Sequence, residues 1–263
     1  DPDCVYVSVD TMKGLDLFDV IRRLHQDHGF GCILLDEVHF HDDFDGELKK
    51  AHDFLDVRVV FTSSTALSMR STAHDLSRRV RLHTLAPFSL RERLLFENGE
   101  ELRLLGLDDI WERRWSRRHA RAVSRFESYL RGGLMPFSLQ EPEVLPLLSN
   151  ILEKILIRDI PRVASLLVEE IDIIRRMLEF VGRAQVDGIN YSSLSRNLGI
   201  TKYKSASYVR LLEQTYVLRQ VFPRGANVMR EPKILMSLPY RLLYMDYDDA
   251  LGGLREDFPA EML

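Results

Sequence analysis

The chain has 263 residues, 45% of them hydrophobic, which is enough apolar material for one large core or two ordinary ones. Its 36 Lys and Arg residues against 40 Asp and Glu give a formal net charge of -4. This balance excludes a globally basic protein, so any basic surface must be local. No apolar run approaches the roughly 20 residues of a membrane span, and no signal sequence opens the chain. We therefore expect a cytoplasmic protein that makes no membrane contact.

The first part of the sequence alternates apolar strands with amphipathic helices. Runs of apolar residues predict strands at 4–9, 32–37 and 57–64. Between them, apolar residues at helical spacing predict helices within 15–29 and 46–56. Strands that are separated by helices indicate a parallel sheet covered on both faces, which is an α/β layer.

Strand signals vanish after Pro87 and return only near residue 216. Four segments of this middle part have the apolar spacing of helices, at 89–106, 110–133, 144–163 and 168–185. From residue 190 onward we expect two short helices, a turn at Gly199, a longer helix and two strands around the sequence PRGANV. The order of helix, turn, helix, strand and wing is that of a winged helix.

The second predicted strand ends in two carboxylates, Asp36 and Glu37. Burying such charges without partners is costly, so we expect them at a working edge of the sheet. An apolar strand ending in Asp-Glu is typical of a Walker B element, in which Asp lies on the magnesium side and Glu polarises the attacking water. A strand that simply meets a polar loop gives the same letters. The third strand favours the Walker B interpretation, because it ends in hydroxyl residues at 62–65, where nucleotide hydrolases with this sheet place a polar residue.

Six further segments share their order and spacing with a known group of proteins. They are DLSRRVRLHTLAPFSLRERL, YLRGGLMPF, NILEKILIRDIPRV, YSSLSRNLGITKYKSASYVRLLEQTYVLRQVFP, KILMSLPYRLLY and GGLREDFPAEML. With them the chain resembles AAA-type ATPases of the archaeal-ATPase-like group, in which an ATPase core is followed by a winged helix and a restriction-nuclease-like domain. The resemblance covers nearly all of the chain, and its specificity lies in the order and spacing of the segments.

The resemblance implies ATP and Mg as cofactors and assigns roles to individual residues. Asp36 would be the acid on the Mg side, and therefore the metal-site residue, and Glu37 the catalytic base. Ser63 or Ser64 would be the sensor that lies between the acids and the γ-phosphate. Arg79 falls on the group's Arg and would meet phosphate charge in its own or a neighbouring subunit. The partners to expect are ATP in the intact protein and a second copy of the chain or a protein client.

The sequence departs from the group's pattern in several places. Arg78 replaces a Gly, Ser63 stands where Gly is expected, and GGLMP carries one extra residue. A P-loop of the form G-x-x-x-x-G-K-[ST], whose N–H groups and Lys bind phosphates, is absent from the sequence. We expect it upstream, because the chain opens without Met and passes directly into a strand. The chain as given is then expected neither to bind ATP tightly nor to hydrolyse it.

The predicted winged helix offers a second chemistry, because the second helix of such a motif can enter the major groove of DNA. Its candidate nucleic-acid-binding residues are Lys202, Lys204, Ser205, Tyr208 and Arg210, with Arg224 and Arg230 around the wing. These are phosphate-type contacts and few in number. The alternative is that the winged helix packs against its own ATPase core or binds protein.

The strongest charge run is WERRWSRRHARAVSR, in which Arg113, Arg117, Arg121 and Arg125 are four apart and would share one helical face. We interpret it as a solvated face over a packed aromatic seam; the alternative is contact with phosphate or a partner subunit. The stretch HFHDDFD offers His and Asp side chains to a metal, but no Cys or His spacing completes a tetrahedral site, so we expect a solvated loop.

The sequence as a whole predicts an α/β fold with an incomplete P-loop-type parallel sheet, followed by a helical lid and a winged-helix domain. The expected boundaries are 1–87 for the partial ATPase core, 88–185 for the lid, 186–236 for the winged helix and 237–263 for the start of a truncated nuclease-like domain. The predicted function is that of a fragment of an ATP-binding and ATP-hydrolysing AAA-type switch or remodelling protein. The alternative is a non-enzymatic winged-helix protein that binds DNA or acts as a scaffold.

Overall fold

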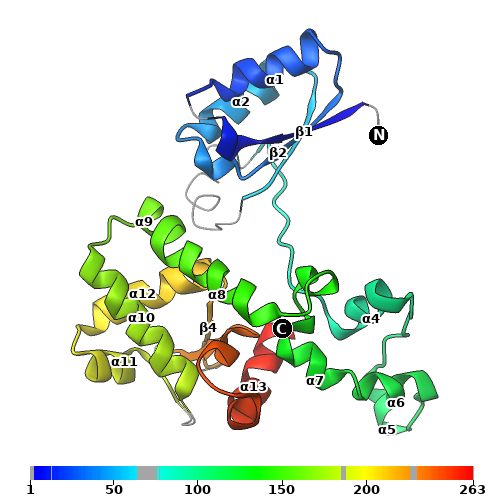
Figure 1. The fold of residues 1–263 in the computed structure, drawn as a ribbon, viewed down its shortest axis with the longest axis vertical. Coiled ribbons are helices and arrows are strands. Elements are labelled where there is room, and N and C mark those ends of the chain that lie inside the picture. Colours follow the sequence, from blue (N-terminus) through cyan, green and yellow to red (C-terminus); the bar gives the residue numbers. More distant parts are fainter. Residues whose placement is uncertain are drawn as a thin grey trace. The chain divides into compact units, whose positions relative to one another are not determined.

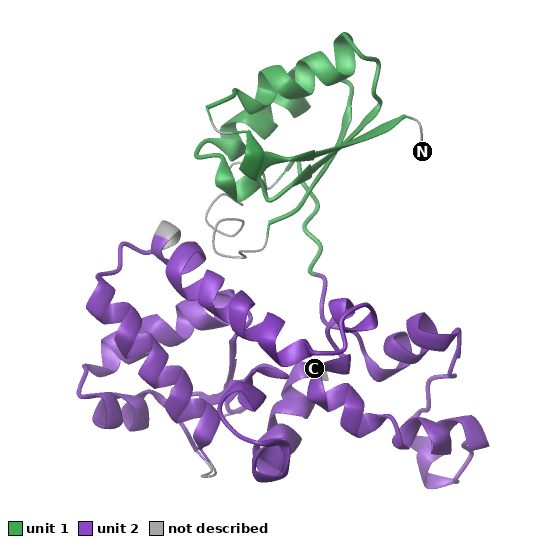
Figure 2. Ribbon diagram, viewed as in Figure 1, with its two compact units in different colours: residues 1–84 green, residues 85–263 purple. Residues whose placement is uncertain are grey.

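The computed structural model describes residues 3–12, 14–63, 76, 78–184, 188–225 and 230–262. The chain divides into two compact units, residues 1–84 and 85–263, which are coloured separately in Figure 2. Each unit has its own hydrophobic core. Among the described residues, no helix has the length and apolar character needed to cross a bilayer.

Unit 1 is a parallel sheet with two helices (Figure 1). Its strands are hydrogen-bonded in the order β1 (Cys4–Ser8), β2 (Cys32–Asp36) and β3 (Arg58–Phe61), and its helices are α1 (Leu17–Gln26) and α2 (Phe44–Phe54). Short 3-10 turns at Val9–Thr11 and Val38–Phe40 follow β1 and β2. The predicted α/β class and the parallel sheet are confirmed.

The side chains of the central strand β2 alternate between the two faces of the sheet. Ile33 and Leu35 are buried in one cluster with residues of both α1 and α2, so these helices lie on the same face. On the other face, Tyr6, Leu34 and Val60 share one row of the register, and Tyr6 and Val60 are 63% and 48% exposed. For the described residues, the prediction that helices cover both faces is therefore wrong.

The stretch HFHDDFD is also not the solvated loop that the sequence predicts. The His39 side chain is only 3% exposed, and α2 already begins at Phe44, which is 4% exposed. The cause is the pair Val38 and Phe44, whose side chains both enter the core of unit 1 and draw the intervening backbone onto it.

Unit 2 begins with a series of mostly short helices. They are α4 (Leu90–Asn98), α5 (Leu107–Trp111), α6 (Arg117–Val123), α7 (Phe126–Ser128), α8 (Val144–Lys154), α9 (Ile160–Val163) and α10 (Val168–Arg183), with helical turns at Tyr129–Gly133, Pro136–Leu139 and Ile155–Asp159. Ser89 and Glu92 form a reciprocal capping box at the start of α4, and Gly99 ends that helix with a φ of 71°.

The single helix predicted across the arginine run is broken. Arg113 has a left-handed φ of 56°, which ends the path of α5, and Ser116 starts α6 through hydrogen bonds from its N–H and hydroxyl to His119 Nδ1 at 3.2 and 2.8 Å. As a result, only Arg117 and Arg121 of the four expected arginines lie four apart on one helix.

The second half of unit 2 has the predicted order of helix, turn, helix and two strands. Its elements are α11 (Tyr191–Leu198), α12 (Lys202–Gln214), the antiparallel strands β4 (Leu218–Val221) and β5 (Lys233–Met236), a turn at Tyr240–Leu243 and α13 (Tyr247–Met262). Gly199 makes the turn between α11 and α12 with a φ of 66°. One core contains residues from α8, α10, α11, α12, β4 and β5, so residues on both sides of the predicted boundary at 185 are packed together.

A buried ion pair joins α13 to the end of α10. Arg241 Nε donates to Asp257 Oδ2 at 2.6 Å and Nη2 donates to Oδ1 at 3.1 Å, and the two side chains are 5% and 0% exposed. The remaining nitrogen, Nη1, donates to the carbonyl oxygens of Val181, Gly182 and Ala184. Burial raises the pKa of Asp257, and the Arg241 guanidinium, together with the N–H of Met236 that donates to Oδ1, favours its ionised form.

Candidate functional site

The carboxyl edge of the parallel sheet gathers the polar residues that follow its strands. Ser8 at the end of β1 is opposite Asp36 at the end of β2, and Thr62 follows the last residue of β3. In open parallel sheets, ligands bind beyond the carboxyl ends of the strands. The acidic pair predicted from the sequence therefore lies at the edge of the sheet where a ligand is expected.

Asp36 is held from both neighbouring strands. Its Oδ1 accepts a hydrogen bond from Thr62 Oγ1, and its Oδ2 accepts one from the Tyr6 hydroxyl at 2.7 Å. The hydrogen bond to Asp36 is the main reason that the pKa of the Tyr6 hydroxyl is raised. Two donors fix the orientation of this carboxylate while each oxygen keeps a further lone pair for a ligand.

Glu37 has an unusual backbone conformation. Its φ of 57° and ψ of 45° lie in the left-handed region, which a residue with a Cβ atom seldom adopts. The conformation is held by Thr62, whose hydroxyl accepts from Glu37 N at 3.2 Å and whose carbonyl accepts from Val38 N at 3.0 Å. Backbone strain of this kind is concentrated at functional sites, so it marks Glu37 as a candidate.

The carboxylate of Glu37 is turned toward a buried histidine. Its Oε2 lies 3.2 Å from Nδ1 of His39, and the two side chains are 20% and 3% exposed. The hydroxyl of Ser63 lies 3.3 Å from the same ring nitrogen. Ser63 therefore reaches the acidic pair through His39, whereas Thr62 contacts Asp36 and Glu37 directly. Ser64, the other predicted sensor, lies outside the described residues.

Sequence reasoning missed the parts that Tyr6 and His39 play at this edge, and it placed Thr62 only within a hydroxyl-rich run. The sequence held only brief signals for Thr62 and His39. Thr62 is the first residue after an apolar strand, and His39 stands two residues beyond Glu37. Tyr6 gave no signal, because its partner Asp36 is 30 residues away in the sequence and the two meet only through strand pairing.

Arg79 is not brought to the acidic pair. Its guanidinium donates to both oxygens of Asp53, from Nε at 2.8 Å and from Nη2 at 3.0 Å, which lowers the pKa of Asp53 to about 2. Asp53 lies at the last turn of α2. Because a helix that connects two parallel strands runs antiparallel to them, that turn is at the amino edge of the sheet, opposite to Asp36. In this structure the ion pair with Asp53 holds the segment around Arg79 against α2.

The carboxyl edge fits a metal ion better than a phosphate group. Mg usually takes one or two carboxylates together with waters and phosphate oxygens, and Asp36 is such a carboxylate. The residues around it, Tyr6, Glu37 and Thr62, are neutral or acidic, so they offer no positive charge to a phosphate. No cluster of three or more His, Cys, Asp or Glu that could hold a metal ion by itself occurs within the described ranges.

The α12 surface differs from the predicted nucleic-acid interface. Ser205 and Tyr208 are buried, at 0% and 3% exposure, because they face the core of unit 2, which corrects the prediction for both residues. Lys202 forms an ion pair with Glu231. Lys204 and the Tyr208 hydroxyl both bind Glu170 of α10, at 2.9 and 2.6 Å.

The charge of this surface is thus largely neutralised within unit 2. The hydrogen bonds from Tyr208 and Lys204 hold the pKa of Glu170 at about 2, well below its usual range, so Glu170 stays ionised and keeps Lys204 paired at neutral pH. Arg210 is exposed, and within the described part of the chain its guanidinium has a hydrogen bond to the carbonyl of Ala206 but no carboxylate partner, so it is the one predicted cation on α12 that is not neutralised there.

Comparison with known proteins relates the two units to different families. Residues 1–94 match the family model of the AAA domain, and residues 123–239 match that of a domain of unknown function (DUF8612). MJ1637, an uncharacterized protein of Methanocaldococcus jannaschii, is 26% identical over 284 aligned positions that cover 97% of this chain and 60% of that protein. The chain thus spans about three fifths of the length of this relative.

Among solved structures, the Aeropyrum pernix ORC1 protein in complex with DNA aligns over 99% of this chain and 79% of that chain, with a TM-score of 0.36 and 11% identity. The family match at 1–94, together with the parallel sheet and the polar edge described above, gives unit 1 an AAA-type ATPase-like fold.

Proposed function

We propose that unit 1 supplies the magnesium-side and water-activating residues of the ATP site in an AAA-type switch or remodelling protein. One observation carries the proposal: Thr62 binds the Asp36 carboxylate and the backbone N–H of Glu37 at the same time, at the carboxyl edge of an AAA-like sheet. This arrangement ties the two acids into one unit of fixed geometry, which catalysis by positioned groups requires.

The roles follow from the contacts of each side chain. Magnesium, when bound with ATP, would supply the charge neutralisation at the phosphates. Asp36, oriented by Tyr6 and Thr62, would hold the metal directly or through a water. Glu37 would accept the proton of the attacking water, and His39 would hold its carboxylate in place. Thr62 would take the sensor position that the resemblance implies for Ser63 or Ser64.

The experiment that tests the proposal is Thr62→Val in the full-length protein, measured as Mg-dependent ATP binding and turnover. Val keeps the shape of Thr but removes its donor to Asp36 and its acceptor for Glu37, so activity or metal affinity should fall about 10- to 100-fold, as for other outer-shell partners of metal ligands. Thr11→Val is the matched control, because among the described residues the Thr11 hydroxyl binds the Ser8 carbonyl and neither acid of the site. Equal losses in the two variants would remove Thr62 from the site.

DNA binding by α12 is the second candidate function. It is favoured by the order of α11, turn, α12 and an antiparallel strand pair, which is that of a winged helix, and by the exposure of Lys202, Lys204 and Arg210. The pairing of both lysines with carboxylates argues for weak binding, since each lysine must exchange Glu170 or Glu231 for a phosphate.

A salt titration of duplex DNA binding tests this candidate. For Glu231→Gln, which frees Lys202, we expect tighter binding than for the unmodified chain and a steeper dependence on salt, by about 0.9 in the slope of log K against log[salt] for one added phosphate contact. Glu213→Gln is a control, because Glu213 binds Gln220 and has no lysine partner among the residues that the structure describes. No change in slope for Glu231→Gln would exclude Lys202 from a DNA interface.

A further inference from the structure

The helices α4, α5 and α6 form one end of unit 2, and residues 89–125 are called the arginine lobe below (Figure 1). Arg103 ties the lobe together. Its guanidinium binds Asp109 of α5 at 3.1 Å and the carbonyl of Arg114 at 3.3 Å, and its own carbonyl accepts from Nε2 of His119 on α6 at 3.0 Å. The segment from α5 to α6 is therefore an ordered surface, although few of its side chains are buried.

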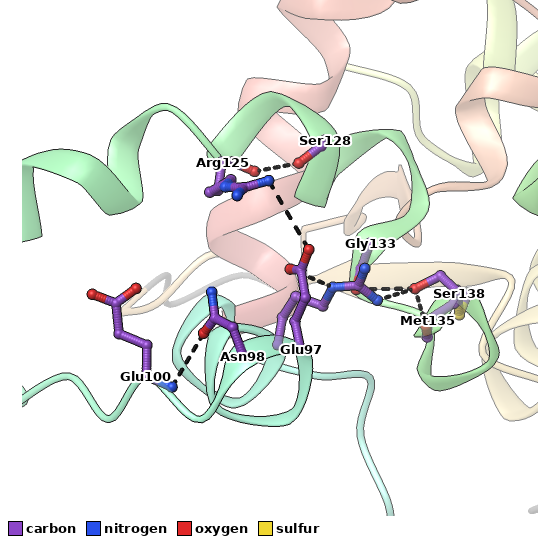
Figure 3. A network of polar contacts seen from close by, with 9 residues as sticks. Glu97, Asn98, Glu100, Arg125, Ser128, Gly133, Met135 and Ser138 are labelled. Atoms are coloured by element: carbon purple, nitrogen blue, oxygen red, sulfur yellow. Dashed lines mark hydrogen bonds and ion pairs between the residues drawn. The ribbon is translucent and has the colours of Figure 1, made fainter. Parts of the chain in front are cut away.

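Part of the lobe's positive charge is used within the fold. Arg93 donates to Ser138, and both Arg93 and Arg125 lie near Glu97, at 3.3 and 4.0 Å; Figure 3 shows Arg125 and Glu97 in this network. Arg114 faces acidic residues of the same lobe. The charges of Arg93, Arg114 and Arg125 are therefore used to stabilise the lobe itself.

Four other arginines have a different environment. Arg113, Arg117, Arg118 and Arg121 are all exposed, and in the part of the chain that the structure describes none of them forms an ion pair or a side-chain hydrogen bond. They lie within nine consecutive residues, and Arg117 and Arg121 are neighbours on one face of α6. In a chain whose net charge is -4, this is a local concentration of uncompensated positive charge.

Both tryptophans of the chain lie beside these arginines. Trp111 is 89% exposed and Trp115 is 46% exposed, and neither makes a ring contact with another aromatic residue in the described ranges. An exposed indole is costly to leave in water, because it presents a large apolar surface. The packed aromatic seam expected from the sequence is absent at these two rings, because the break at Arg113 turns α5 and α6 away from one continuous helix.

We propose that Trp111, Trp115 and the four unpaired arginines form a binding site for single-stranded nucleic acid. Such sites combine exposed aromatic rings, on which bases stack, with cations that follow the phosphate backbone, and they need no deep groove. A flexible strand can place a base on Trp111 and phosphates on Arg113, Arg117 and Arg121 together, whereas the bases of a duplex are already stacked on one another. This site is separate from α12 and does not depend on the ATP site proposed for unit 1.

The two tryptophans give the experiment its reporter, because the chain contains no others. Titration of the purified chain with oligodeoxythymidylate should quench the intrinsic tryptophan fluorescence by stacking. The slope of log K against log[salt] should be about -2.8, from four phosphate contacts at roughly 0.7 each for a single strand. The single-strand assignment would be overturned if duplex DNA quenched the fluorescence and bound with the same affinity and the same salt dependence as oligodeoxythymidylate. The site itself would be overturned if neither nucleic acid quenched the fluorescence.

Variants separate the contributions, with binding followed by the fluorescence anisotropy of a labelled oligonucleotide. Trp111→Ala should weaken binding by about 5- to 150-fold, the range for loss of one stacked base, and Trp111→Phe should restore most of it. Arg117→Ala with Arg121→Ala should reduce the magnitude of the salt slope by about 1.4. All of these side chains are exposed, so circular dichroism and the midpoint of thermal unfolding should match those of the unmodified chain.

Two controls show whether the effect belongs to this lobe. Arg22→Ala removes a half-buried arginine of α1 that is already paired with Asp19, so it should leave binding unchanged. Lys202→Ala with Lys204→Ala removes the cations of α12 and should also leave it unchanged. If the α12 variant weakens oligonucleotide binding and the lobe variants do not, the proposal is wrong. A lobe that captures an acidic protein but no oligonucleotide, through its exposed Leu107 and Ile110, would equally refute it.

Discussion

Glu37→Gln in the full-length protein is expected to bind ATP and to hydrolyse it about 10²- to 10⁴-fold more slowly, the usual contribution of a positioned general base. The amide is similar in size to the carboxylate and can keep the contact with His39, but it cannot accept the proton of the attacking water. The measurements are the affinity for a fluorescent ATP analogue and the rate of phosphate release.

The control for this variant is Asp42→Asn, because Asp42 is an exposed acid that follows the same strand a few residues later. It removes the same charge from the same region and should leave turnover unchanged. Turnover of Glu37→Gln equal to that of the unmodified protein would remove Glu37 from the role of base. Loss of ATP binding together with turnover would instead assign Glu37 to the binding of Mg and ATP.

Arg241→Met is expected to lower the free energy of unfolding of unit 2 by about 3–5 kcal/mol, because it leaves the Asp257 carboxylate buried without its partner. It also deprives three carbonyl oxygens at the end of α10 of a donor. Urea unfolding followed by circular dichroism measures the loss. The transition of unit 1 should not move, because Arg241 and Asp257 lie in the core of unit 2.

Two further variants separate charge from packing in this prediction. Arg255→Met removes an exposed arginine from α13, and its effect should be within about 0.5 kcal/mol of zero. Arg241→Met combined with Asp257→Leu removes the uncompensated charge, so it should recover much of the stability lost by the single variant. A double variant that is no more stable than Arg241→Met would show that the loss comes from packing and from the unpaired carbonyls rather than from the buried carboxylate.

The parallel sheet could be predicted from the sequence because its information is local and periodic. Apolar runs separated by amphipathic helices specify βαβ units, and an Asp-Glu pair at the end of such a run lies at the carboxyl edge in any register. The coverage of the sheet could not be predicted in the same way. Whether α1 and α2 share a face depends on how Leu17, Ile21 and Leu48 pack together, and pattern alone does not show this.

The polar contacts of the site were harder to predict from the sequence, for a related reason. Tyr6 and Thr62 meet Asp36 across strands, and the partners of Lys202 and Lys204 come from segments about 30 residues away in each direction. A sequence pattern identifies a lysine on a helix surface but not the carboxylate that neutralises it. The single helix predicted across the arginine run was wrong for the opposite reason. The helical spacing there is local and regular, but a left-handed residue, Arg113, and a new helix start at Ser116 interrupt it.

The core that α8, α10, α11, α12 and the β4–β5 pair share has a mechanical consequence. A DNA-binding helix on a flexible linker could move independently of the rest of its protein. Helix α12 cannot, because its buried side packs with α10 in the same core. Any displacement of α10 would have to move α12 with it. Separating the chain into two fragments between these helices would expose core residues of both fragments. The helix–turn–helix is thus a fixed face of a larger rigid body rather than a detachable module.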